Sequence, residues 1–71
     1  MDEKIVFEKT ERGQREIAQP GGELNPKQRR ILVLVDGAKS LGELAPMTRP
    51  GEIEPTVESL LHGGYIIATD G

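Results

Sequence analysis

Cysteine and tryptophan are absent from this 71-residue sequence, and phenylalanine, tyrosine and histidine occur once each. The absence of cysteine excludes a disulfide framework and a thiolate metal site, and one histidine is too few for a zinc site. No apolar run approaches the ~20 residues that span a bilayer, and the N-terminal segment MDEKIVFEK lacks the basic start and apolar centre of a signal peptide. We therefore expect no metal, no other cofactor, no membrane partner and a cytoplasmic location.

Length and charge narrow the class of protein further. The 71 residues form one small domain, 1–71, near the lower size limit for a chain that folds alone, so a second copy or a larger partner would add stability. The net charge is −3, from nine Lys and Arg against twelve Asp and Glu. Domains that bind nucleic acid are usually basic, because their cations neutralise phosphates. The overall charge therefore disfavours nucleic acid, and the distribution of the cations must decide.

Residues 1–19 begin with a strand, and the segment after it is open to two interpretations. Lys4–Lys9 has the β-branched and aromatic content of a short strand. Thr10–Ala18 could be a short helix capped by its first residue, or Arg12–Gly13 could form the turn of a hairpin that pairs with the strand. We favour the hairpin, because glycine weakens a helix and suits a turn.

A linker at residues 20–24, with one proline and two glycines, leads to a predicted three-helix core at residues 25–63. Asn25 is a favourable N-cap, and Pro26 is tolerated at the first helical position. The first helix is expected to continue through the apolar run ILVLV and to end at Asp36–Gly37, where the glycine is the C-terminal stop.

Two further helices and a strand complete the predicted fold. The S-x-x-E motif that begins at Ser40 is a capping box, and Pro46 ends the helix that this motif starts. A third helix is expected over Glu54–His62, and Tyr65–Thr69 is expected to be a strand that pairs with Ile5–Glu8. The predicted class is α+β, of the winged helix-turn-helix type, with three helices and a small antiparallel sheet formed by the N- and C-terminal strands.

The sequence also resembles a known type of domain. The pattern K-T-x-x-G-x-x-E-I, followed by L-x-P-x-x-R, an apolar run and V-D-G-x-x-S-L-x-E-L, is similar to small bacterial winged-helix-like domains of uncharacterised function. Its D-G-x-x-S-L-x-E-L part is also similar to the peptide-binding winged-helix modules of peptide-modifying pathways. The matching residues are Lys9, Thr10, Gly13, Glu16, Ile17, Leu24, Pro26, Arg29, Val35, Asp36, Gly37, Ser40, Leu41, Glu43 and Leu44. The resemblance implies a winged-helix fold and, for the second group, a peptide that adds a strand to the sheet edge.

The charge of the third predicted helix helps to decide between DNA binding and protein binding. In a helix-turn-helix protein this helix enters the major groove, yet here it carries carboxylates and neither Lys nor Arg. Cations elsewhere could still contact a nucleic-acid backbone and position the protein on it. These are Lys27, Arg29 and Arg30 on the first helix of the core and Arg49 in the loop before the third. A DNA-binding transcriptional regulator is therefore the alternative function.

The preferred prediction is a non-enzymatic regulatory module that binds a protein or peptide partner, or a second copy of itself. One candidate surface is the exposed edge of the terminal sheet, where a partner could add a strand. The other is the acidic third helix, which would suit a basic partner. The candidate contact residues are Ile5, Phe7, Tyr65 and Ile67 in the sheet and Glu54 and Glu58 on the helix. No nucleophile or pocket-building aromatic accompanies the two glutamates, so we expect no enzyme.

Overall fold

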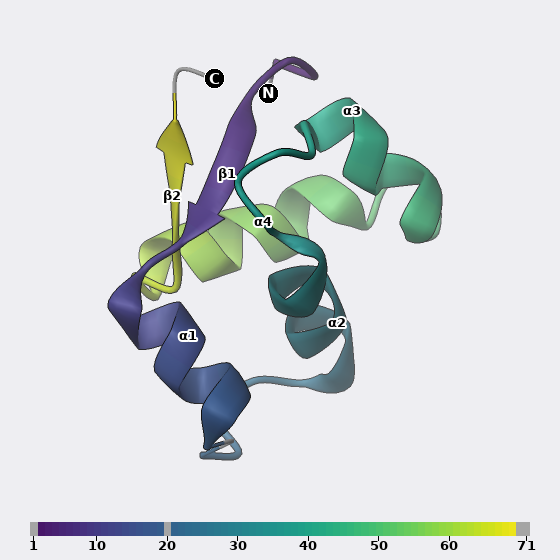
Figure 1. Ribbon diagram of the computed structural model, residues 1–71. Helices are drawn as coiled ribbons and strands as arrows, with labels where there is room; N and C mark the ends of the chain where they lie inside the picture. The colour runs from purple at the N-terminus through teal and green to yellow at the C-terminus, as the bar shows by residue number, and fades with distance from the viewer. Residues whose placement is uncertain (1, 20, 70–71) are drawn as a thin grey trace.

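Four α-helices and two strands make up the described part of the chain, residues 2–19 and 21–69, in the computed structural model (Figure 1). In chain order they are β1 (Val6–Lys9), α1 (Glu11–Ala18), α2 (Pro26–Leu34), α3 (Leu41–Leu44), the 3₁₀ turn η1 (Ala45–Met47), α4 (Ile53–His62) and β2 (Ile66–Thr69). The predicted α+β class, with an antiparallel sheet formed by the two terminal strands, is confirmed. The predicted helix number is wrong, because the described residues contain four α-helices instead of three. The predicted linker starts at residue 20, which, like residues 1, 70 and 71, lies outside the described part.

Helix α1 replaces the hairpin that we favoured. The side chain of Thr10 accepts a hydrogen bond from the backbone N–H of Gly13 at 3.1 Å, as an N-cap does, and Glu11 complements the helix dipole in the first turn. Gly13 is buried, and a Cβ atom built on it would lie 2.1 Å from the carbonyl oxygen of Tyr65. The glycine is needed for close packing of the helix against a distant backbone segment, and no turn occurs at this position.

The predicted start of α2 is confirmed, and its predicted end lies too far along the chain. Asn25 accepts from the N–H of Gln28 at 2.8 Å, and the Gln28 side chain accepts from the N–H of Asn25 at 2.9 Å, which completes a capping box. The helix ends at Leu34, because Val35 has extended backbone angles. Gly37 has a φ of 81° in the turn that follows, where glycine is favoured.

Helix α3 begins at the predicted cap and is only one turn long. Ser40 accepts from the N–H of Glu43 at 3.3 Å. In a capping box the Glu43 carboxylate would accept from the backbone N–H of Ser40. Here it accepts instead from the Ser40 hydroxyl, at 3.4 Å. Pro46 lies within η1, which leads into the connection before α4. Helix α4 starts at Ile53, one residue before the predicted start, and ends at His62 as predicted.

The core lies between the sheet and the helices, and α4 passes behind the two strands in Figure 1. Its members are Phe7, Ile31, Leu32, Val35, Leu41, Leu44, Ile53, Val57, Leu60, Tyr65 and Ile66. Helix α2 packs against α4, and α1 packs against both α2 and β1. Within the described residues, each helix is too short or too polar to cross a membrane.

Candidate interaction surfaces

Strand β1 is bonded along both of its edges, which removes it as a site for strand addition. One edge pairs with β2 in an antiparallel register that runs from Val6 opposite Thr69 to Lys9 opposite Ile66. The other edge is covered by residues 37–42. In that segment the N–H groups of Gly37, Leu41 and Gly42 donate to the carbonyl oxygens of Phe7, Ile5 and Glu3 at 3.1, 2.8 and 2.9 Å.

Strand β2 pairs on one edge only, since β1 is its only neighbouring strand within residues 2–19 and 21–69. The N–H of Thr10 donates to the carbonyl oxygen of Tyr65 at 3.0 Å. This bond shows that the backbone groups of Tyr65 face the β1 side of the sheet. In an antiparallel pair the backbone groups of every second residue face the partner strand. Ile67 and Thr69 therefore bond toward β1, and the backbone groups of Ile66 and Ala68 point away from it. Ile66 is buried, so of these two residues only Ala68 is exposed.

The four predicted contact residues of the sheet differ in their exposure. Phe7 and Tyr65 are 1% and 5% exposed and belong to the core, so their side chains are not at the surface. Strand alternation alone could not show this, because it does not say which face the helices cover. Ile5 is half-buried, while Ile67 is 51% exposed on the outer face of β2. Ile67 is the predicted sheet residue that a partner can reach most directly.

Tyr65 holds three chain segments together. Its hydroxyl donates to the carboxylate of Glu23 at 2.8 Å, and the guanidinium of Arg12 lies 4.9 Å from the centre of its ring. Arg12 also lies 3.6 Å from the same carboxylate, and the Tyr65 hydroxyl is the main cause of a raised Arg12 pKa. The predicted site residue Tyr65 is thus a structural link between α1, the linker and the start of β2.

Helix α4 presents the acidic side chains that the sequence predicts. Glu54 and Glu58 are both exposed and lie one turn apart on the helix, so their carboxylates share one face. Ile53, Val57 and Leu60 point into the core from the opposite side. The acidic face is therefore the solvent face of α4.

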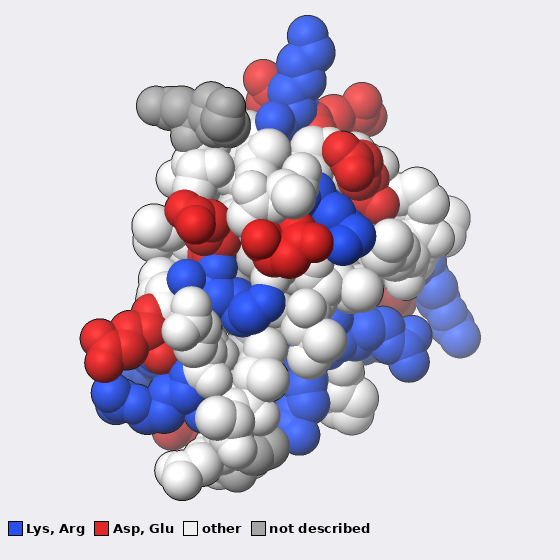
Figure 2. Space-filling model, viewed as in Figure 1, with Lys and Arg blue, Asp and Glu red and all other residues white. Residues whose placement is uncertain are grey.

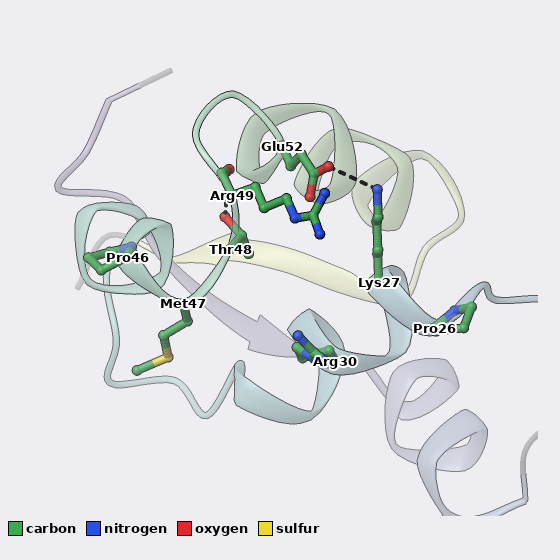
Figure 3. A pocket seen from close by; sticks show the side chains of 8 residues that line it. All are labelled: Pro26, Lys27, Arg30, Pro46, Met47, Thr48, Arg49 and Glu52. Atoms are coloured by element: carbon green, nitrogen blue, oxygen red, sulfur yellow. Dashed lines mark hydrogen bonds and ion pairs between the residues drawn. The ribbon is translucent and has the colours of Figure 1, made fainter.

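Three of the four predicted backbone-contact cations surround one hollow. Lys27 and Arg30 of α2 and Arg49 of the η1–α4 connection line it, whereas Arg29 is half-buried and outside it. We call this feature the basic hollow; it measures about 380 Å³, and its other lining residues are Pro26, Pro46, Met47, Thr48 and Glu52. Figure 3 shows Lys27 and Arg49 extending into the same opening, with Arg30 on α2 beside it.

One carboxylate lies in the wall of the basic hollow. The ammonium of Lys27 lies 2.9 Å from the carboxylate of Glu52. The pKa of Glu52 is lowered, first by this hydrogen bond and also by the charges of Lys27 and Arg49. Within the described residues, the guanidinium groups of Arg30 and Arg49 make no hydrogen bond or ion pair with the protein. Two cations in the hollow are therefore available to an incoming anion.

The remaining cations do not extend this group into a continuous band. Arg15 is paired with Glu11 at 3.4 Å on α1, and Lys39 with Asp36 at 2.8 Å in the turn before α3. Figure 2 shows acidic and basic side chains interleaved over most of the face in view, with basic side chains lying over α2. On the face in view, acidic side chains separate the basic groups, and a long track for a polyanion is absent from it.

Sequence reasoning missed Met47, a 43% exposed apolar side chain in the lining of the basic hollow. The available signal was the unusually long connection PMTRPGE, in which an apolar residue and a cation lie between prolines. The chain matches no protein-family model, no curated protein and no solved structure. Among the described residues, no group of three His, Cys, Asp or Glu side chains could hold a metal ion.

Proposed function

We propose that this protein is a non-enzymatic, winged-helix-type regulatory module that binds an extended segment of a protein or peptide by strand addition to β2. The observation that carries the proposal is the one-sided pairing of β2, while both edges of β1 are occupied. The order α2, α3, α4 and β2 supports the winged-helix type, because it matches two short helices and a third helix followed by a strand.

The composition of β2 favours pairing with a partner. Proteins usually protect an edge strand with Lys, Pro, a bulge or a covering segment. The strand sequence IIAT contains neither a charge nor a proline. An added segment would bond to the exposed backbone groups of Ala68, and its outer side chains would lie beside Ile67, which is 51% exposed. Backbone bonds would supply affinity, and the Ile67 contact would supply preference for an apolar neighbour.

DNA binding is the weaker of the two functions. The face of α4 that would have to enter a groove carries Glu54 and Glu58, which repel phosphates. Two or three cations at one hollow could position a few phosphates, but they would read no bases.

The test is selection from a library of displayed random peptides, followed by mapping of the enriched peptides onto the protein by amide chemical shifts. We expect the largest shifts at residues 66–69. Ala68→Pro should weaken binding about tenfold or more, because it removes the outward N–H and adds a ring at the pairing edge. Ala68→Ser keeps the N–H and is the matched control.

Two results would contradict the proposal. Peptides that shift only residues far from β2, or that bind Ala68→Pro as tightly as the wild type, would exclude strand addition. Binding of mixed-sequence duplex DNA at low salt, with shifts centred on α4 and no peptide enrichment, would instead favour the DNA-binding regulator.

A further inference from the structure

Apolar and basic side chains occur together around the basic hollow. Three large apolar side chains are exposed in the described protein: Val33, Met47 and Ile67. Met47 lines the hollow, and Val33 follows Arg30 by three residues on α2, which places it one turn along the same helix face. Met47 is therefore part of the hollow itself, and Val33 lies next along α2 from the lining residue Arg30.

We propose that the basic hollow binds an acidic segment of a partner protein in which Asp or Glu alternates with large apolar residues. Carboxylates of this segment would pair with Arg30 and Arg49, whose planar guanidinium groups match a carboxylate in two-point geometry. Its apolar side chains would cover Met47 and Val33, which would leave water on binding. The site is separate from the β2 edge and does not depend on strand addition.

The wall of the hollow favours such a segment over a nucleic-acid backbone. Glu52 lies in the lining, and Glu54 and Glu58 follow it on α4. Phosphates that reached Arg49 would lie close to the Glu52 carboxylate in the same lining and be repelled by it. A phosphodiester chain would also leave Met47 and Val33 exposed. A short peptide can place single carboxylates at Arg30 and Arg49 and avoid the acidic face.

The test uses a short fluorescein-labelled peptide of alternating Asp or Glu and Leu or Phe, with fluorescence anisotropy as the readout. The same peptide with Asn and Gln in place of its acids, and a short labelled DNA duplex, are the comparison probes. We expect the acidic peptide to bind and the neutral peptide to bind at least about tenfold more weakly. Arg30→Gln and Arg49→Gln should each weaken binding of the acidic peptide about tenfold. Arg15→Gln removes the same charge from α1, away from the hollow, and should leave affinity unchanged.

Glu52→Gln distinguishes a binding role from a structural one. This variant keeps the shape of the side chain, removes the carboxylate from the wall and releases Lys27 from its ion pair. The acidic peptide should therefore bind several-fold more tightly, an outcome that general loss of structure would not produce. Ala68→Pro should leave this affinity unchanged, so failure of strand addition and failure of the hollow are distinguishable.

Four outcomes would overturn the proposal. The first is equal binding of the acidic and neutral peptides, and the second is wild-type affinity for the acidic peptide in Arg30→Gln and Arg49→Gln. The third is that the protein binds the DNA duplex more tightly than the acidic peptide, through Arg49 and with the steep salt dependence of counterion release. The fourth is concentration-dependent self-association, seen by sedimentation and abolished by Arg30→Gln, which would make a second copy the occupant.

Discussion

Gly13 lies so close to the backbone of Tyr65 that an added Cβ atom would be 2.1 Å from the Tyr65 carbonyl oxygen. The same oxygen accepts a hydrogen bond from the N–H of Thr10 at 3.0 Å. The first turn of α1 is therefore fixed to the residue that precedes β2. Because β2 carries the proposed binding edge, the packing of α1 sets the position of that edge.

Gly13→Ala should destabilise the protein by about 1–3 kcal/mol, the usual cost of forcing an extra group into a close-packed site. Alanine favours a helix over glycine by about 1 kcal/mol, so a helix without this contact would be stabilised instead. Urea unfolding followed by circular dichroism measures the difference. Gly21→Ala is the control, because its Cβ atom would meet only the Glu16 carboxylate, at an ordinary 3.6 Å. A Gly13→Ala variant at least as stable as the wild type would show that the contact is absent.

Thr10→Ala should cost about 1–2 kcal/mol of unfolding free energy. The hydroxyl accepts from the N–H of Gly13 at 3.1 Å and donates to the carbonyl oxygen of Gly64 at 2.6 Å, and alanine loses both bonds. Thr10→Ser keeps both and should lie close to the wild type in the same urea experiment. Equal losses in the two variants would mean that the methyl group, and neither hydrogen bond, matters at this position.

Local signals along the chain predicted the elements well wherever the cause of the structure is itself local. The start of α2 follows from Asn25 and Gln28, which cap each other, and from Pro26 at the first helical position. The apolar faces of α3 and α4 were likewise readable from spacing within one helix. The end of α2 was harder to predict from the sequence. The chain leaves the helix after Leu34 and turns toward β1, where the Gly37 N–H bonds to the strand.

The errors arose where distant segments meet. Gly13 suggested a turn from its own preferences, while its role is set by Tyr65, far along the chain. Phe7 was predicted to lie at an exposed sheet edge, but residues 37–42 cover that edge of β1. The grouping of the candidate cations also depends on contacts between distant segments. Lys27 and Arg30 are close because they share a helix, but only the path of the η1–α4 connection brings Arg49 to them.

Asp36 makes the stability of the turn before α3 dependent on pH. Its carboxylate accepts from the Lys39 ammonium at 2.8 Å and from the N–H groups of Ala38 and Lys39 at 2.9 and 3.1 Å. These bonds, that of the Lys39 side chain first, hold the pKa of Asp36 well below its ordinary 3.8. The folded protein therefore binds this proton more weakly than the unfolded chain does. The resulting stabilisation is fully present above the ordinary pKa and is lost as pH falls toward the lowered value.

Asp36→Asn should accordingly be less stable than the wild type at neutral pH and approach it as the solution becomes acidic. Urea unfolding over a series of pH values from 7 downward to about 2 measures this convergence, since the slope of stability with pH reports the difference in bound protons. Lys39→Gln removes the first cause and leaves the two backbone donors, so the NMR-detected pKa of Asp36 should rise part of the way toward 3.8. Parallel stability curves for Asp36→Asn and the wild type would show that this carboxylate titrates alike in the folded and unfolded chains.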